Sequence, residues 1–356
     1  MRNFLLLALT AALLSFAAGP SSAAVTLKQN WQAGQQLVYD TNIDGNLSLQ
    51  IPANVPTMIA GMPLEIGLRG VGKTTLNTLK VNDFGDGTVQ AKINPLNLEA
   101  ETFGQKAIIK VNNGNAVATL NGAQQNVPFI DWGLITNPPI ALTFSPQMKV
   151  TDFASTDQAT STATSKPAVP TGIMAMIQNL ILQSLPAVLP TKSLNVGDKW
   201  TSDVQFKTSP APNAASVKLG SFQFELKDPQ TMEGRSLQHI SVHGDLDMTS
   251  EQSKTLKAGF GVADADADAD ATDDKSSSTT KLLTDMLSNH LFSFGQTVDG
   301  DLYFDTQAGH FVQADLNLDS QLQTLPSTDG PSTPDGFVNF SGIVRFKLSP
   351  AVAAKP

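Results

Sequence analysis

Residues 67–74 carry the pattern of a phosphate-binding loop, G-x-x-x-x-G-K-T, at every fixed position. In nucleotide-binding proteins this loop joins a strand to a helix, and the helix directs its N-terminal N–H groups and its dipole at the phosphates. Here residues 75–81 are largely β-branched and polar and lead into the turn 83–87, which leaves no room for that helix. We therefore predict that Gly67–Thr74 forms an edge of a β-sheet and that the protein has no nucleotide site.

The histidines are candidates for metal binding and for acid–base chemistry. His239 and His243 alternate with apolar residues in the segment 238–248, and they share one face with Ser241, Asp245 and Asp247. On a strand the two histidines lie about 13 Å apart, which is too far to share one metal ion. His243 and Asp245 lie about 6.6 Å apart and are close enough. We expect a solvated outer face, with no metal and no cofactor.

The run of alternating Asp and Ala at 264–270 could offer carboxylate oxygens to calcium. It lacks the glycine turn and the final Glu of a calcium-binding loop. Like charges at every second residue keep a segment extended and soluble. We therefore predict a flexible acidic loop over residues 263–280.

Nucleophilic catalysis has no recognisable motif in this sequence. There is no G-x-S-x-G element, no cysteine and no Asp-Thr-Gly or Asp-Ser-Gly triplet. A glycosidase needs only two carboxylates, whose positions in space a sequence does not reveal. We predict a non-enzymatic protein, and keep as an alternative a glycan-acting hydrolase that would use carboxylates from the set Asp245, Asp247, Asp305 and Asp315.

The first residues predict export from the cytoplasm. Arg2 precedes an apolar run from Phe4 to Ala18, and small residues follow up to Ala24. This is the arrangement of a signal peptide with its cleavage site, and the run is short for a membrane span. We expect residues 1–24 to be removed and the mature chain, without a membrane span, to work in the periplasm or outside the cell.

Composition narrows the range of partners. The formal net charge is −9, and the acids are 26 Asp and 6 Glu, a ratio that favours turn-rich β structure over helix. An acidic chain is poorly suited to nucleic acid, which selects for clusters of Lys and Arg. The absence of cysteine leaves an exported fold without disulfides, so its stability must come from its core.

Most of the chain after residue 25 alternates apolar and polar residues, which is typical of antiparallel strands with one buried face. The segments 76–93, 107–120 and 301–322 are predicted hairpins, because each has turn-forming residues between two alternating arms. In the last strand, 337–348, the residues expected to point inward are Val338, Phe340, Val344, Phe346 and Leu348.

Two segments have helical spacing instead, 171–185 and 279–291. The division that we predict is a signal peptide (1–24), a first β module (25–150), a linker (151–170), an apolar helix (171–187) and a second β module (188–350). A faint repeat aligns residues 31–40 with 194–203, and a true duplication and convergence of hairpins are equally open. The fold class is mainly β with a few helices: a large curved antiparallel sheet, or two related β modules, with the apolar helix on the concave face.

The element Leu189–Trp200, L-P-x(6)-G-D-x-W, resembles a segment that recurs in uncharacterised exported bacterial β-rich proteins. The resemblance covers about a third of the chain, implies an envelope protein and supplies no catalytic residues. At the level of fold, a long antiparallel sheet with an apolar helix is also similar to the half-barrels of periplasmic lipoprotein carriers.

These observations predict a protein that binds an apolar or amphiphilic, lipid-like ligand, or an envelope protein, in the concavity of the sheet. The alternative is a structural or surface-interaction module of the cell envelope. The candidate ligand-binding residues are those of the apolar helix: Ile173, Met174, Met176, Ile177, Leu180 and Ile181.

Overall fold

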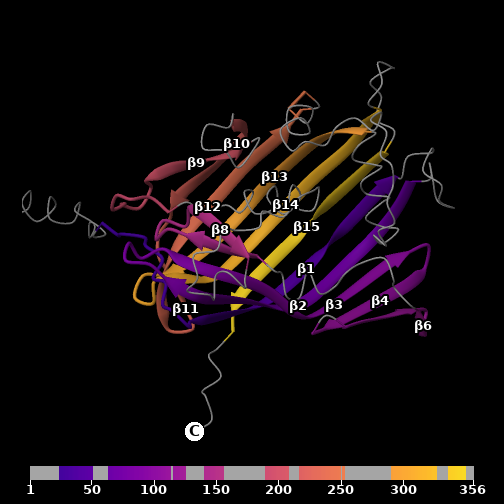
Figure 1. Ribbon diagram of the computed structural model, residues 1–356, viewed down its shortest axis with the longest axis horizontal. Helices are drawn as coiled ribbons and strands as arrows, with labels where there is room; N and C mark the ends of the chain where they lie inside the picture. The colour runs from indigo at the N-terminus through magenta and orange to yellow at the C-terminus, as the bar shows by residue number, and fades with distance from the viewer. Residues whose placement is uncertain are drawn as a thin grey trace, which may run out of the picture.

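The computed structural model describes residues 24–50, 63–113, 115–125, 140–155, 189–207, 216–249, 251–252, 290–326 and 336–349. The strands of these residues form a 15-stranded antiparallel sheet (Figure 1). This confirms the predicted mainly β fold built on a large antiparallel sheet. Of the two arrangements predicted, one large sheet is correct, because strands from both halves of the chain belong to it.

The first half of the chain supplies β1 (Gln36–Gln50), β2 (Pro63–Val81), β3 (Gly87–Thr102), β4 (Gln105–Asn112), β5 (Asn115–Leu120), β6 (Ala123–Gln125), β7 (Ile140–Phe144) and β8 (Val150–Ser155). The second half supplies β9 (Lys199–Lys207), β10 (Ser216–Leu226), β11 (Gln230–Met232), β12 (Arg235–Met248), β13 (His290–Asp305), β14 (His310–Pro326) and β15 (Gly336–Leu348). All three predicted hairpins are confirmed, as β2–β3, β4–β5 and β13–β14.

The strand order is β6-β5-β4-β3-β2-β1-β15-β14-β13-β12-β10-β9, and β7 and β8 branch from β3. Each half of the chain is thus a meander, in which strands that follow one another along the chain lie side by side. The halves are joined by pairing of β1 with β15, from Tyr39 opposite Leu348 to Gln50 opposite Phe337. This pairing places the first strand of the chain in the middle of the sheet (Figure 1).

The topology is consistent with a duplication. Each meander begins after a turn whose glycine has a positive φ, +78° at Gly34 and +90° at Gly197. In both cases the strand starts two residues later, β1 at Gln36 and β9 at Lys199. The aligned segments 31–40 and 194–203 therefore have the same local structure and the same place in their meanders.

The register divides the side chains into two faces. Ile43 lies opposite Val344, and Val344 lies opposite Leu316, so apolar positions of neighbouring strands match. Because side chains alternate across a strand, these residues point to one side, which we call the inner face. The opposite side, the outer face, carries the polar residues that alternate with them. The inward direction predicted for the last strand is confirmed, because its residues share this register.

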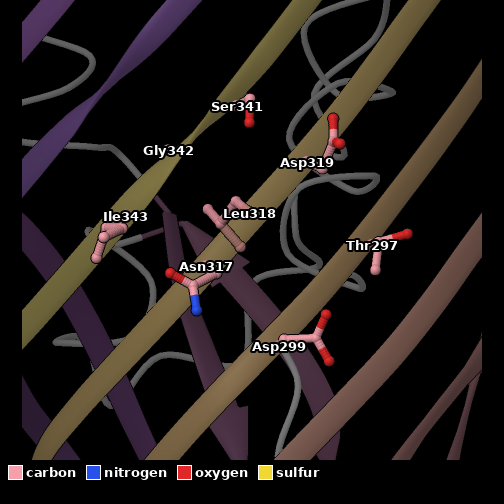
Figure 2. A pocket seen from close by; sticks show the side chains of 8 residues that line it. All are labelled: Thr297, Asp299, Asn317, Leu318, Asp319, Ser341, Gly342 and Ile343. Carbon is pink, nitrogen blue, oxygen red and sulfur yellow. The ribbon is translucent and has the colours of Figure 1, made fainter.

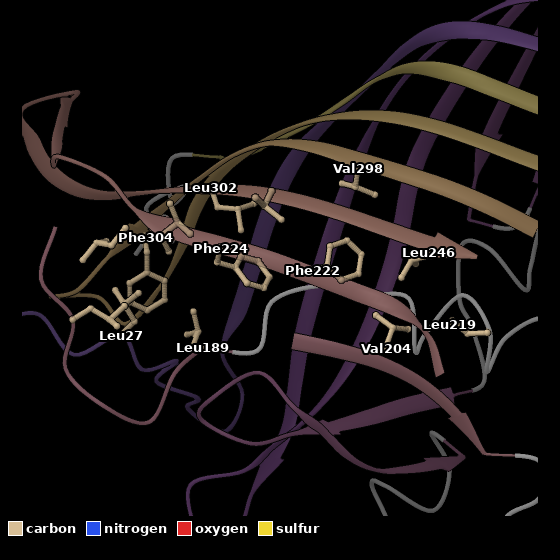
Figure 3. Close-up of a cluster of buried hydrophobic side chains, with 14 of the residues drawn as sticks. Leu27, Leu189, Val204, Leu219, Phe222, Phe224, Leu246, Val298, Leu302 and Phe304 are labelled. Atoms are coloured by element: carbon tan, nitrogen blue, oxygen red, sulfur yellow. The ribbon is translucent and has the colours of Figure 1, made fainter. Parts of the chain in front are cut away.

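The largest buried cluster lies on the inner face of β10, β12 and β13, where Phe222, Ile240 and Phe304 are fully buried (Figure 3). Leu27 and Leu189, which precede β1 and β9 in the chain, pack against the inner face of these strands. Two smaller described clusters lie elsewhere, one around Trp31, Leu142 and Phe144 and the other around Leu96 and Val111.

The segment before β1 closes one end of the sheet. Val25 and Leu194 exchange backbone hydrogen bonds, the Gln29 N–H donates to the Pro146 carbonyl, and the Asn30 N–H donates to the Gly309 carbonyl. These bonds join the β7–β8 turn, the β13–β14 turn and the residues before β9. Leu27 packs in the largest cluster and Trp31 in the second, so the same segment also links the two cores. We call this region the closed end.

Residues 67–74 were predicted to be an edge of the sheet, and this is wrong. They lie within β2, which pairs with β1 on one side and with β3 on the other. The glycines explain the difference, since a strand approaches its neighbours closely where it lacks side chains. A Cβ atom on Gly70 would lie 3.0 Å from Leu98 Cδ2, and one on Gly72 would lie 2.9 Å from the Pro95 carbonyl oxygen. The phosphate-loop pattern is therefore strand throughout.

The predicted helix at 171–187 lies outside the described residues, as do most of the linker 151–170 and the acidic loop 263–280. The second helical prediction, 279–291, is wrong at its end. His290 and Leu291 belong to β13 and pair with Pro326 and Leu325 of β14. Pairing along this long hairpin overrides the local helical spacing of the leucines.

Candidate functional site

Away from the closed end, the inner face carries apolar side chains that belong to none of the three described clusters. We call this part the open region; its residues, from β1, β2 and β15, are Ile43, Leu47, Leu49, Leu64, Ile66, Leu68, Val338, Phe340 and Val344. All are half-buried except Val338, which is 43% exposed. The open region is continuous across the junction of the two meanders.

The apolar side chains of the open region are only partly covered. Burying apolar surface is worth about 25 cal/mol per Å², so these side chains gain from any apolar cover. A continuous row of apolar side chains that the described core does not cover can bind an apolar ligand or a partner. The open region is therefore the candidate binding site.

The centre of the open region is flattened by glycine. Gly45 and Gly342 lie opposite each other in the β1–β15 pair. The ring of Phe340 lies against both positions, because added Cβ atoms would be 3.0 Å from its Cε2 and 2.9 Å from its Cζ, respectively. The aromatic ring thus forms a broad apolar floor rather than standing away from the sheet.

Polar groups separate this floor from the closed end. The Tyr39 hydroxyl donates to the Phe311 carbonyl oxygen at 2.8 Å, and the hydroxyls of Thr41 and Thr74 share a hydrogen bond of 2.7 Å. Tyr39 and Thr41 are buried, and burial raises the pKa of the Tyr39 hydroxyl, which stays neutral. These groups satisfy one another, so they belong to the framework of the site.

The outer face carries histidine–carboxylate pairs. His243 Nδ1 lies 2.6 Å from Asp299 Oδ1, and His243 Nε2 lies 3.2 Å from Asp245 Oδ2. His239 Nε2 lies 2.6 Å from Asp301 Oδ1. The hydrogen bond to Asp299 raises the pKa of His243 above its usual value, with the nearby Asp245 adding to the effect. Both histidines lie on the face predicted for them.

An open depression of about 240 Å³ lies beside these pairs (Figure 2). Its polar lining comes from three neighbouring strands and comprises Thr297, Asp299, Asn317, Asp319 and Ser341. One of its carboxylates, Asp299, is already bound to His243. The depression is a feature of the solvated outer face, on the side of the sheet opposite the open region.

Three of the four carboxylates predicted as candidates for glycan hydrolysis accept hydrogen bonds from different groups. Asp245 accepts a hydrogen bond from Thr297, and Asp315 accepts one from Gln313 and lies 3.6 Å from the Arg345 guanidinium. Asp305 accepts the backbone N–H groups of residues 307 and 308 in the β13–β14 turn. Asp247 is exposed on the outer face. This arrangement does not favour a hydrolase over a binding protein.

Two kinds of feature are absent from the described residues. No group of three or more His, Cys, Asp or Glu side chains there is placed to hold a metal ion. Among the same residues no helix is long and apolar enough to span a membrane.

The ligand-binding residues predicted from the apolar helix, Ile173 to Ile181, lie outside the described residues. Their role stays a prediction. The open region was missed as a site, although the alternation of the last strand already placed Val338, Phe340 and Val344 inward. The missing information was which inward residues pack in the core and which do not.

Comparison with known proteins identifies no family. No protein-family model matches the chain, and no curated protein matches it. One solved structure similar to it is described as lipid–protein interactions in lipovitellin, with 13% sequence identity and a TM-score of 0.36. The match covers 91% of this chain and 26% of that chain, so this chain spans about a quarter of that chain's length. A TM-score of 0.36 is too low to assign a fold family or a function to this chain. The resemblance of Leu189–Trp200 to an exported family stays a prediction.

Proposed function

We propose that the protein binds an amphiphilic, lipid-like ligand whose acyl chain lies on the open region of the inner face. The observation that supports this most directly is the continuous apolar surface of β1, β2 and β15, whose side chains lie outside the described clusters of the core. Its setting, on this proposal, is the periplasm or the extracellular space to which the predicted signal peptide directs the chain.

The dimensions of the open region suit a long acyl chain. From Ile43 to Leu49 the strand advances about 20 Å, at 3.3 to 3.4 Å per residue. Leu47 and Leu49 lie opposite Phe340 and Val338, so two apolar strands run side by side over this length. The glycine pair at Gly45 and Gly342 keeps the middle of this path low, which lets a flexible chain lie along it.

The proposal is tested by titrating diphenylhexatriene, an apolar fluorophore, into the purified protein and displacing it with monoolein. The variant Val344→Asp places a carboxylate on the inner face, and Ile343→Asp places the same group on the outer face of the same strand. Burying a charge is far costlier than burying a methyl group, so Val344→Asp should weaken fluorophore binding by at least about tenfold. Ile343→Asp should leave binding unchanged.

Thermal unfolding of both variants serves as the control for folding. The proposal is contradicted if the folded wild-type protein does not bind the fluorophore, or if the two variants weaken binding equally. The first result would favour the alternative function, a structural or surface-interaction module of the cell envelope.

A further inference from the structure

A polar pair stands within the apolar inner face. Gln296 of β13 and Ser320 of β14 lie opposite each other, and the Gln296 Nε2 donates to the Ser320 Oγ at 3.1 Å. Val298, two residues from Gln296 on the same face, is buried in the largest cluster. The side chains around the pair are Leu246, Phe294, Val298, Leu318, Leu322 and Phe340.

The position of the pair relates it to the open region. Ser320 pairs with Phe340, the residue whose ring forms the floor, and Phe340 pairs with Leu47 of β1. One row of the inner face therefore runs from Gln296 through Ser320 and Phe340 to Leu47. The polar pair therefore lies at the border between the open region and the largest cluster.

The hydrogen bond between the two side chains does not use their full capacity. It leaves the Gln296 carbonyl oxygen, its second amide hydrogen and the Ser320 hydroxyl hydrogen for other partners. Both residues are half-buried. Polar atoms beside apolar surface lose hydration when that surface is covered, so a ligand that covers the open region gains by supplying hydrogen bonds here.

We infer that Gln296 and Ser320 bind the ester or amide linkage of the acyl ligand, an inference that rests on the proposed function. The neighbours of the pair on the inner face are apolar and uncharged, so the site favours a neutral group over an ion. A carbonyl oxygen accepts from the Ser320 hydroxyl and the free Gln296 N–H, and the Gln296 carbonyl oxygen accepts from an amide or a hydroxyl next to the linkage. The acyl chain then extends over Phe340 toward Leu47.

The Thr41–Thr74 pair differs from the Gln296–Ser320 pair in its surroundings. Those hydroxyls also lie on the inner face, but Thr41 is buried and accompanies the buried Tyr39 near the closed end. The Gln296–Ser320 pair lies instead at the border of the largest cluster, between its buried Leu246 and Val298 and Phe340 of the open region. Its polar atoms are therefore placed to meet a ligand, whereas those of Thr41 and Thr74 hold two strands together.

The test compares two probes on three variants. Diphenylhexatriene has no hydrogen-bonding group, whereas monoolein has a neutral ester. We expect Gln296→Leu and Ser320→Ala to bind the fluorophore as the wild type does. Monoolein should displace it roughly fivefold to tenfold less effectively, as expected for the loss of one or two hydrogen bonds. Gln321→Leu is the control: it makes the same change as Gln296→Leu, but on the outer face of β14. It should change neither measurement.

The outcomes separate the two proposals. If the fluorophore does not bind the wild type, the proposed function fails. If the fluorophore binds and monoolein displaces it from all three variants as effectively as from the wild type, the open region binds apolar molecules but the polar pair takes no part. Equal weakening of both probes would show that the substitutions disturb the surface and would also overturn the inference.

Discussion

Gly45 of β1 lies directly opposite Gly342 of β15, at the junction between the two meanders. A Cβ atom on Gly342 would lie 2.5 Å from the Asp44 carbonyl oxygen and 2.6 Å from the Gly45 Cα atom. Both are backbone atoms, which cannot move aside as a flexible side chain can. The close approach that joins the halves of the sheet therefore requires glycine at this point.

The first prediction follows from this contact. Gly342→Ala should lower the free energy of unfolding by about 1–3 kcal/mol, because the added methyl group forces the two strands apart. Gly295→Ala is the matched control, since nothing lies within 4 Å of a Cβ atom there. Its effect should stay within about 0.5 kcal/mol. Urea denaturation measures both, and equal effects would contradict the account of the junction.

The β3–β4 turn predicts a stabilising substitution. Phe103 has a φ of +49° in this turn, and its side chain is 78% exposed. A left-handed conformation costs a residue such as Phe roughly 1–2 kcal/mol, and Asn tolerates it better. Phe103→Asn should therefore stabilise the protein by up to about 1 kcal/mol in thermal or urea unfolding. Unchanged or lower stability would mean that the exposed ring makes contacts that compensate for the turn.

Asn121 provides the reciprocal test, because its φ is +48° in the β5–β6 turn. Its side-chain oxygen also accepts the Lys106 N–H at 3.0 Å. Asn121→Phe should destabilise the protein by about 1–2 kcal/mol through the conformation and the lost hydrogen bond together.

His243 predicts a pH dependence of stability. Its hydrogen bond to Asp299 raises its pKa above the value of about 6.5 in the unfolded chain. Between these two pKa values the folded protein binds more protons, so this contribution is full below pH 6.5 and is lost as pH rises through the raised pKa. His243→Gln should therefore reduce stability more at pH 5.5 than at pH 9, measured by urea denaturation. A reduction of the same size at both pH values would contradict the pairing.

His310 predicts the opposite sign. Burial lowers its pKa, and this effect outweighs the opposing effects of a backbone hydrogen bond with Ala308 and of the nearby Asp305. The unfolded chain then binds more protons below pH 6.5, so this contribution is full above pH 6.5 and is lost as pH falls through the lowered pKa. His310→Leu should remove that acid-induced loss in the same denaturation series. A variant that loses stability with acid as steeply as the wild type would show that His310 is not its source.

Alternation in the sequence was sufficient to predict the hairpins and the inward face of β15, because each depends on residues near one another in the chain. It did not predict that β1 pairs with β15, since that contact joins residues 287 to 309 positions apart and depends on how the two meanders meet. The sequence also did not show that Gly67–Thr74 lies inside the sheet, because the residues that come close to its glycines belong to neighbouring strands.

The candidate site shows the same limit. Periodicity assigns Gln296 to an apolar face, where a single polar residue is a visible anomaly. Only the register brings Ser320 opposite it and Phe340 next in the row. The residues that pack in the core and those that form the open region have the same pattern in the sequence, because both alternate at a period of two.

The most direct test of the proposed function is photolabelling with a fatty acid that carries a diazirine on its acyl chain, followed by peptide mass spectrometry. We predict labels on inward residues of β1 and β15, including Leu47, Phe340 and Val344, and competition of the labelling by monoolein. Labels confined to outer-face residues such as Ile343, or labelling that monoolein does not reduce, would contradict the proposal that the open region binds an acyl chain.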